Sequence, residues 1–259
     1  MEYLTLSYSN RDKVGVITLN RPDVMNALNT QMRAEIAHAV KAAPETGARV
    51  VVLTGQGRAF CSGQDLGDRA NAADLNLERT LRDEYVPMIE AVARCPLPTI
   101  SAVNGAAAGA GANLALAADV VIASESAYFL QAFTRIGLIP DAGGTYWLPR
   151  QMGLAKAMGA ALFAEKISAK QASDWGMIWE VAADEEFVDH WRRRALSLAN
   201  GPTVAYRGVK ESLRASCDNS LDEQLTLEAK IQGMCGRTND FREGVLAFLE
   251  KRAAAYEGR

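Results

Sequence analysis

Apolar and polar positions follow different periods along the first sixty residues of the chain. The β-branched run Gly15 to Asn20 (GVITLN) predicts a strand, and Arg21-Pro22-Asp23 predicts the turn that ends it. Asn29 or Thr30 can cap an amphipathic helix that follows. Val50 to Thr54 (VVVLT) is an apolar run, as expected of a strand that is covered on both faces. This part of the chain therefore predicts a strand, a helix and a second strand.

The middle of the chain continues this alternation. Helical periodicity extends from Leu81 to Val92, where Pro87 either kinks one helix or starts a second one. Pro98 to Val103 and Asp119 to Ala123 are candidates for short buried strands on either side of a Gly/Ala run, Gly105 to Ala112. Strands that alternate with helices predict an α/β architecture.

The pattern changes after Ser168, which can start a helix. Met177 to Val181 is the last expected strand, and the best junction is Ala199 to Pro202. We therefore predict a core of residues 1–199 and a helical C-terminal region of residues 200–259. Such a short helical region can hardly bury its own apolar faces, so it should dock on the core or on a neighbouring subunit. The expected late helices are Glu185 to Ala199, Thr203 to Ala215, Leu221 to Cys235 and Asp240 to Ala255.

Composition limits the possible functions. The chain has 259 residues, of which 49% are hydrophobic and 23% charged, as is ordinary for a globular protein of one domain with an appendage. Its net charge is -3 and its densest basic group is Arg192-Arg193-Arg194, so we expect no nucleic-acid partner. Asp68 to Asn76 is polar and rich in Ala and Asn, which predicts a mobile segment.

Cysteine and histidine usage narrows the compartment and the chemistry. The four cysteines show neither metal-ligand spacing nor a disulfide framework. The two histidines, His38 and His190, lie in charged helical segments, so a zinc site or a histidine triad is not supported. We find no signal peptide and no apolar run of membrane-spanning length, and we therefore expect a cytoplasmic protein without a membrane partner.

Candidate chemistry is concentrated between Asn104 and Thr145. The run Gly105 to Ala112 has almost no side chains, so a ligand or another backbone can approach the main chain closely. A helix that starts there would leave its first N–H groups free to bind an anion or oxyanion. Asp141 is a lone acid in an apolar stretch that includes Phe133 and Leu138. Free donors beside such an acid suit enolate chemistry, although tight packing and a turn aspartate explain the same residues.

Several motifs, taken together in this order, make the chain resemble the enoyl-CoA hydratase/isomerase (crotonase) superfamily over nearly its whole length. Each motif is weak alone, but their order and distances are specific. They are Arg21-Pro22 with Asn26-Ala27-Leu28, Ala59 to Leu66, Asn104-Gly105 with the Gly/Ala run, Gly137 to Thr145, Arg242-Glu243-Gly244, Ala247-Phe248 and Glu250-Lys251-Arg252.

This resemblance implies a fold and a binding mode. The fold would be a superhelical core of repeated ββα units followed by a helical trimerisation region. Two backbone N–H groups, at the positions that match Gln64 and Ala110, would form an oxyanion hole for an acyl-CoA thioester. Coenzyme A, as part of the substrate, would lie against the backbone at Ala27, Gln64, Asp65 and Leu66. The side chains at Gln64 and Ala110 would then matter little, because the N–H groups do the work.

The resemblance also separates reaction types. Family hydratases hold a water with two glutamates, and the matching positions here are Asn113 and Phe133. The acid is instead Asp141, the position used by members that shift double bonds or rearrange the acyl group. A dienoyl isomerase would want a second acid near Phe133. Dehalogenase members use the aspartate as a nucleophile but need a pocket histidine, and Arg82 to Met88 contains none.

Within the superfamily, the likeness is greatest to the isomerases that convert ring-1,2-epoxyphenylacetyl-CoA to the oxepin thioester in phenylacetate degradation. Supporting stretches include Phe60 to Leu66, Gly137 to Asp141 and Trp175 to Trp179. The reaction would use Asp141, with its pKa raised by an apolar pocket, to move a proton without a metal or redox cofactor. Alternatives are a 3-enoyl to 2-enoyl-CoA isomerase, a hydratase of fatty-acid breakdown, and a non-catalytic acyl-CoA binding protein.

Further expectations concern the pocket lining and the C-terminal helix. Phe129, Phe133 and Trp147 could line an acyl pocket, and Asn113 is expected to be a packing or polar-lining residue. In the family the final helix often contributes to binding of the next subunit's ligand, which makes Lys251 a candidate phosphate contact. The family likewise suggests a trimer or a dimer of trimers.

Overall fold

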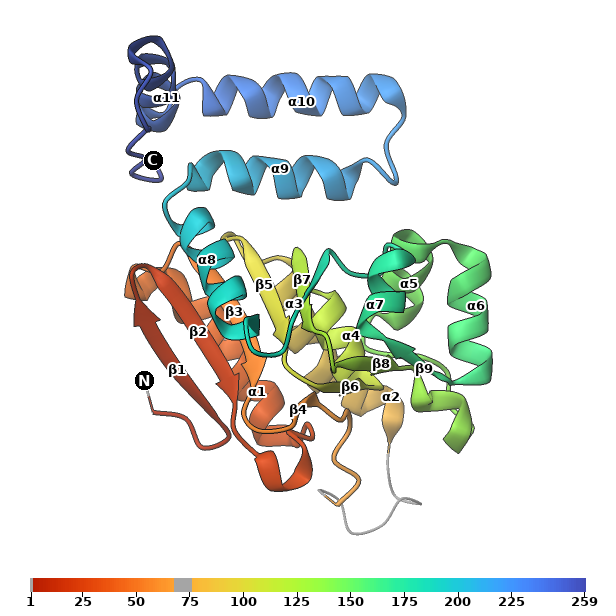
Figure 1. The fold of residues 1–259 in the computed structure, drawn as a ribbon. Coiled ribbons are helices and arrows are strands. Elements are labelled where there is room, and N and C mark those ends of the chain that lie inside the picture. Colours follow the sequence, from red (N-terminus) through yellow and green to blue (C-terminus); the bar gives the residue numbers. More distant parts are fainter. Residues whose placement is uncertain (1, 68–75) are drawn as a thin grey trace.

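Two sheets form the centre of the protein (Figure 1). The computed structural model describes residues 2–67 and 76–259, so the segment predicted to be mobile, Asp68 to Asn76, lies outside the described residues except for Asn76. The six-stranded sheet has the order β1-β2-β3-β5-β7-β10, in which only the β1–β2 hairpin is antiparallel. Its strands are β1 (Leu6–Arg11), β2 (Val14–Leu19), β3 (Val50–Gly55), β5 (Thr99–Val103), β7 (Val120–Ser124) and β10 (Glu180–Ala182).

The strands of the second sheet mostly follow the carboxyl ends of strands of the first sheet. Three strands of the large sheet, β3, β5 and β7, are each followed after a short turn by a strand of the four-stranded sheet β4-β6-β8-β9. After β4 and after β6 a helical segment returns the chain to the large sheet, so these units have the order strand, strand, helix. After β8 the helices lead first to β9 of the small sheet, and one more helix precedes β10 of the large sheet. This is the expected ββα superhelix. The small-sheet strands are β4 (Ala59–Cys61), β6 (Ala106–Ala108), β8 (Tyr128–Leu130) and β9 (Lys166–Ser168).

Alternate residues of β3 face two different cores, which explains its apolar sequence. Val50 and Val52 pack with the helix α8 on one face of the large sheet. Val51 and Leu53 pack on the other face with α1 and α3. Both faces are therefore buried, as the VVVLT run predicts. The helices that complete the core are α1 (Thr30–Ala42), α2 (Leu77–Thr80), α3 (Val86–Ala93), α4 (Ala110–Leu116), α5 (Gly144–Met152), α6 (Leu154–Phe163), α7 (Ala169–Asp174) and α8 (Phe187–Ala199).

Local caps account for several of these boundaries. The side chain of Asn29 accepts a hydrogen bond from the N–H of Met32 and caps α1, and Ser168 caps α7 in the same way through Gln171. The helix expected over Leu81 to Val92 starts as a π-helical turn, which is followed at Val86 by α3. This π-helical segment is η4 (Leu81–Tyr85), and the described residues also contain the 3₁₀ helices η1 (Pro22–Val24), η2 (Ala43–Thr46) and η5 (Ala132–Ile136).

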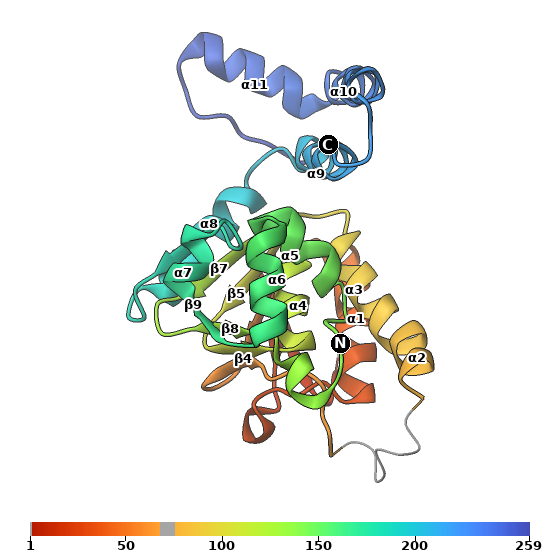
Figure 2. The same cartoon turned by 90° about the vertical axis from the view of Figure 1, so that its right-hand side faces the viewer.

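The last three helices form an arm that stands apart from the two sheets, as Figures 1 and 2 show. The arm consists of α9 (Thr203–Ala215), α10 (Leu221–Cys235) and α11 (Asn239–Glu250). Lys210 and Arg214 on α9 each lie 2.7 Å from a carboxylate oxygen of Asp119 in the core. A buried arginine, Arg49, hydrogen-bonds the main-chain carbonyl of Tyr256 near the C-terminus at 3.0 Å. The division at residues 199 and 200 stays a prediction.

The structure differs from the sequence expectations at two places in the C-terminal third. The last strand covers Glu180–Ala182, not Met177 to Val181, because the N–H of Met177 bonds the carbonyl of Ala172 and closes the end of α7. The final helix ends at Glu250 instead of Ala255, because Lys251 adopts a left-handed conformation (φ 53°) that terminates it.

Candidate active site

Three neighbouring parallel strands of the small sheet end at one place. Cys61 of β4 lies beside Ala107 of β6, and Ala108 of β6 lies beside Leu130 of β8. Loops that leave adjacent parallel strands emerge side by side, which is where α/β proteins bind ligands. The topology therefore brings together two residues predicted from motifs far apart in the chain, Gln64 after β4 and Ala110 after β6.

Glycine is required where these two loops meet. Gly63 has φ +94°, and a Cβ atom placed on it would lie 2.8 Å from the carbonyl oxygen of Ala108 and 3.4 Å from the nitrogen of Ala110. Gly109 has φ +51° and ψ -129°, a conformation that L side chains rarely adopt. These two glycines let the loops approach closely and set the direction of the N–H groups that follow them.

The N–H groups of Gln64 and Ala110 are both free donors. Leu28 pairs with the Gln64 loop through the carbonyl of Gly63 (2.7 Å) and the N–H of Asp65 (3.2 Å), so the N–H of Gln64 points away from Leu28. The N–H of Ala110 starts α4, a helix of only seven residues. Within residues 2–67 and 76–259, neither N–H has a hydrogen-bond acceptor. The pair can therefore donate to one oxygen atom of a ligand.

The Gly/Ala run also has a packing role, as the alternative interpretation of this run predicts. A Cβ atom on Gly105 would lie 2.3 Å from the carbonyl oxygen of Arg58, and one on Gly111 would lie 2.3 Å from that of Cys61. These glycines hold β6 and α4 tightly against β4. Close packing at Gly105 and Gly111 thus fixes the position of the free N–H of Ala110, which follows Gly109.

The residues expected to bind coenzyme A form one surface beside the donors. Arg21 pairs with the carboxylate of Asp65 at 2.7 Å and donates to the carbonyl of Ala27 at 2.6 Å. The backbone of Gln64, which precedes Asp65, forms a bridge with Leu28, which follows Ala27. The side chain of Leu66 is 72% exposed. The structure thus places Ala27, Gln64, Asp65 and Leu66 together.

Asn26 explains why the motif that contains Ala27 has this sequence. Its side chain accepts a hydrogen bond from the N–H of Arg21 and donates to the carbonyls of Gln56 and Ala59. Asn26 is fully buried and has φ 55°, a conformation that asparagine tolerates better than most residues. The side chain ties the turn before Ala27 to the strand that leads to Gln64.

Asp141 is a half-buried acid with an altered pKa. Burial raises its pKa from the usual 3.8 to about 6. Its Oδ1 atom is buried and has no hydrogen-bond partner in the part of the chain that the structure describes. Because neither a cation nor a donor there stabilises the carboxylate through this atom, the group is suited to exchange a proton near neutral pH.

The backbone on either side of Asp141 is held in place. Its carbonyl oxygen accepts hydrogen bonds from the N–H of Gly144 (2.8 Å) and from Nδ2 of Asn113 (2.7 Å). Ala142 and Gly143 both have positive φ angles, 47° and 85°, which turn the chain sharply into α5. Asn113 lies one helical turn after Ala110 on α4, so the acid and one free donor are joined through a short rigid element.

The apolar surroundings of Asp141 differ in part from the sequence expectation. Ile139 is 75% exposed, while Phe129 is a fully buried residue of β8. Phe133 is buried and lies closest to the donors, since its ring edge would be 3.8 Å from a Cβ atom on Gly109. Trp147 packs instead beside Gly143, and the Arg214 guanidinium lies 5.9 Å from its ring centre. Among the three predicted aromatics, Phe133 is the one beside the donor pair.

Sequence reasoning missed two polar residues beside the donors. Tyr85 donates a hydrogen bond to Oε1 of Gln64, and the fully buried Arg33 donates to the same oxygen at 3.2 Å. In the segment Arg82 to Met88, which contains Tyr85, the only chemical feature used for prediction was the absence of a histidine. The signal available was a tyrosine and an arginine at positions of helices that otherwise face the core.

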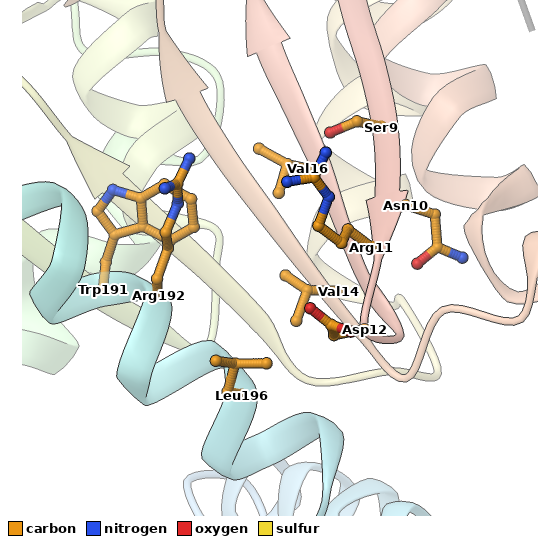
Figure 3. A pocket seen from close by; sticks show the side chains of 9 residues that line it. All are labelled: Ser9, Asn10, Arg11, Asp12, Val14, Val16, Trp191, Arg192 and Leu196. Carbon is orange, nitrogen blue, oxygen red and sulfur yellow. The ribbon is translucent and has the colours of Figure 1, made fainter.

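Other parts of the molecule lie away from this site. Figure 1 shows α11 and its end at Lys251 on the arm, far from β4 and α4, so Lys251 of the same chain does not contact the site. A separate hollow of about 450 Å³ lies between the β1–β2 hairpin and α8, at the opposite end of the strands (Figure 3). None of the helices in the described ranges is both long and apolar enough to cross a membrane.

The fold and the site together define a crotonase-fold protein in which two free backbone donors accompany a half-buried acid. The model of the enoyl-CoA hydratase/isomerase family matches residues 9–259, and the chain belongs to this family.

Comparison with individual proteins adds detail. The chain is 60% identical to a Rhodobacter capsulatus protein named "Probable enoyl-CoA hydratase", over 100% of both chains. It is 46% identical to the 1,2-epoxyphenylacetyl-CoA isomerase of Escherichia coli, over 95% of both chains. A crystal structure of an enoyl-CoA hydratase from Bacillus anthracis superposes with a TM-score of 0.91 at 33% identity, and the match covers 99% of this chain and 100% of the other. These relatives carry the names of both reaction types.

Proposed function

We propose that the protein is an isomerase of acyl-CoA thioesters in which Asp141 is the base and the N–H groups of Gln64 and Ala110 form the oxyanion hole. The observation that carries this proposal is the half-buried Asp141 carboxyl, whose buried Oδ1 has no partner among the described residues and whose backbone is tied to the helix of Ala110. Family membership supplies the substrate class.

The reaction follows from these groups. The thioester carbonyl oxygen accepts the two hydrogen bonds, which makes the C–H bond at the α-carbon more acidic. Asp141 removes that proton as the carboxylate, and the electron pair moves onto the thioester oxygen. The protonated Asp141 then returns the proton to another carbon, which shifts the double bond. A pKa of about 6 suits both steps near neutral pH. The proposed cycle moves one proton, and the two N–H groups stabilise the negative oxygen, so it uses no metal or redox cofactor. Coenzyme A is part of the substrate.

For the acyl group we propose ring-1,2-epoxyphenylacetyl-CoA, with 3-enoyl-CoA as a second substrate. The support is the 46% identical E. coli isomerase and the ring edge of Phe133 beside the donors. An aromatic ring of the substrate can meet this edge in an edge-to-face contact, which contributes beyond simple burial. A linear 3-enoyl chain would use the same base and donors.

A hydratase is the second candidate, favoured by the name of the 60% identical relative. Hydration needs an acid or base that activates water. Asn113 is fully buried, its Oδ1 accepts from Gln131 at 2.9 Å and its Nδ2 donates to Asp141 at 2.7 Å. An amide has no basic group that could activate water, both ends of the Asn113 side chain are engaged within the protein, and Phe133 offers no acid or base either. The site therefore supports isomerisation better than hydration.

The deciding experiment is Asp141→Asn assayed with three substrates: the epoxide thioester, a linear 3-enoyl-CoA and a 2-enoyl-CoA with water. We expect turnover of the first two to fall roughly 10²–10⁴-fold, as for loss of a general base, while binding of a CoA ester is unchanged. Asp174→Asn, which removes an exposed carboxylate that pairs with Lys170, is the matched control.

Wild-type turnover by Asp141→Asn would show that another group is the base. A specificity constant for hydration of the 2-enoyl-CoA that exceeds both isomerisations would establish the hydratase instead. A wild-type protein that binds CoA esters but turns over none of the three would be a non-catalytic binding protein.

A further inference from the structure

A buried polar cluster lies directly behind the loop of Gln64. Arg33 on α1 is fully buried, and its Nη1 atom donates to the carbonyl of Leu28 at 2.6 Å and to Oε1 of Gln64 at 3.2 Å. Its other nitrogens bind the carboxylate of Glu84, which compensates the buried charge. A charge is placed in a protein interior at considerable cost, so its contacts are informative. Two of the contacts of Arg33 are made with Leu28 and Gln64, the two residues of this β-bridge.

The side chain of Gln64 is held at both ends. Its Oε1 accepts hydrogen bonds from the hydroxyl of Tyr85 and from Arg33, and its Nε2 donates to the carbonyl of Asp65 at 3.1 Å. Glycines at positions 63 and 67 flank this loop. Glycine-rich loops lose more entropy on ordering than other segments, so a fixed side chain in the middle restrains the peptide plane.

Tyr85 is placed for this contact by an unusual backbone. It is the last residue of the π-helical turn Leu81–Tyr85, a feature that often occurs at functional sites. The ring is buried and its centre lies 4.8 Å from the Arg33 guanidinium carbon. Burial raises the pKa of Tyr85, so its hydroxyl stays protonated and remains a donor over the physiological range.

We propose that Arg33 and Tyr85 are positioning residues that orient the main-chain N–H of Gln64 toward the thioester oxygen. This inference rests on the proposed function, in which that N–H is an oxyanion donor. It replaces the expectation that the side chain at position 64 matters little. Both contacts end on Gln64, and the donor strength of an oxyanion hole depends on its geometry, so the cluster affects the reaction through the direction of one N–H group.

The proposal predicts loss of carbonyl polarisation, which can be observed directly. A saturated acyl-CoA labelled with ¹³C at the thioester carbonyl binds without turnover, and hydrogen bonds to the oxygen shift its ¹³C resonance and lower its C=O stretching frequency. The variants are Tyr85→Phe, Gln64→Ala and the double variant. Tyr8→Phe is the matched control, because Tyr8 also has a hydroxyl with a hydrogen bond, 2.7 Å to Thr46 on the surface.

We expect Tyr85→Phe and Gln64→Ala to lose part of the carbonyl shift and to lower kcat by at least roughly 10-fold. The loss should stay below the 10²–10³-fold loss that is typical when an oxyanion donor itself is removed. KM and the affinity for the CoA ester should change by less than about 3-fold. The double variant should be no worse than Gln64→Ala, because both changes interrupt one contact. Tyr8→Phe should behave like the wild type.

Different results test the proposed function and the positioning role separately. If the wild type does not shift the carbonyl signal, the oxyanion hole and with it the proposed function are wrong. If the wild type shifts it and both single variants retain the full shift and turnover, the positioning role is wrong. A Tyr85→Phe protein with lower stability but an unchanged carbonyl signal overturns it as well. Gln64→Ala changes a half-buried loop residue, so the test does not depend on repacking around Tyr85.

Discussion

Asn113 donates a hydrogen bond of 2.7 Å from its side-chain Nδ2 to the main-chain carbonyl oxygen of Asp141. The other end of the same amide accepts a bond of 2.9 Å from Nε2 of Gln131. Asn113 lies on α4, the helix that begins at Ala110. One buried side chain thus sets the position of the candidate base relative to one of the candidate oxyanion donors.

Replacing this side chain should affect stability and turnover together. Asn113→Leu keeps the size of the residue but removes the bond to Asp141 and leaves a buried donor of Gln131 without a partner. We expect a loss of about 1–3 kcal/mol in the free energy of unfolding. Turnover should fall roughly 10-fold or more with little change in CoA-ester affinity, because the base is displaced. Urea titration and steady-state kinetics measure the two effects.

The control is Asn10→Leu, which removes a surface asparagine whose side chain bonds the carbonyl of Thr46 at 2.8 Å. It should leave turnover unchanged. Wild-type turnover by Asn113→Leu would mean that Asp141 is positioned without this bond.

The rate should depend on pH through Asp141. The carboxyl acts as a base only when it is ionised, and its pKa is raised by burial to about 6. The value of kcat/KM should therefore be constant above about pH 7 and should fall tenfold per pH unit well below 6. The thiol of Cys61 has a pKa raised by burial to about 12 and does not titrate in this range. An acidic limb centred near pH 4 would contradict a buried, unpaired carboxylate.

The same shift affects the stability of the fold. Because burial raises the pKa of Asp141 from 3.8 to about 6, the native protein keeps its proton at pH values where the unfolded chain has lost it. Stability from this group therefore falls as the pH rises from about 4 to 6 and stays lower above 6. Asp141→Asn should be more stable than the wild type at pH 8, by on the order of 1 kcal/mol or roughly 2–4 °C in Tm.

This gain should disappear toward pH 4, where the wild-type carboxyl is protonated as well. Thermal unfolding at both pH values measures it, with Asp174→Asn as the exposed control. An Asn variant that is less stable than the wild type at pH 8 would show that the Asp141 carboxylate is stabilised by its surroundings.

The order of strands and helices could be predicted because it is encoded locally, and the family resemblance implied the superhelical fold and the candidate donor residues. The VVVLT run is covered on both faces as its composition predicts, and Asn29 caps the helix that its position suggests. The motif around Gln64 could be matched to the family without knowledge of any tertiary contact. The strands β4, β6 and β8, in contrast, have three residues each, too few to show a period of two.

What surrounds Gln64 could not be predicted for a physical reason. Arg33 and Tyr85 lie 31 and 21 residues away in the sequence, and each lies among the buried positions of its helix. Nothing in the local pattern distinguishes an inward arginine that binds a loop from one that extends to solvent.

The arm should be the main surface between subunits. Its described helices expose large apolar side chains, among them Leu213, Leu221, Phe248 and Leu249, whereas Ile231 fills the contact between α9 and α10. We expect light scattering at micromolar concentration to give a trimer or a dimer of trimers. Phe248→Asp should lower the mass, because Phe248 is 83% exposed in the single chain and a charge there disturbs only an interface.

Leu4→Asp is the matched control, an equally exposed apolar residue outside the arm. A stable wild-type monomer of 27.9 kDa would contradict the assembly.

Lys251 should contribute to binding of coenzyme A only across such an interface, because it lies at the end of α11, away from its own site (Figure 1). No acid among the residues that the structure describes forms an ion pair with Lys251, whereas its neighbour Arg252 binds Glu243 and Glu250. A phosphate of the neighbouring subunit's ligand is a suitable partner. Lys251→Ala should weaken CoA-ester binding roughly 2–5-fold, as expected for an exposed charge pair.

The loss should be larger at low salt than at high salt, because screening weakens exposed charge pairs. Lys251→Asn is a second variant, since asparagine tolerates the left-handed backbone (φ 53°) of this position better than alanine. Lys230→Ala, on α10 of the same arm, is the control and should leave affinity unchanged. The chemical step should be intact in all three proteins. A lower single-turnover rate at saturating substrate, with unchanged affinity, would exclude a phosphate contact, because an anchor far from the reacting carbon affects binding and not proton transfer.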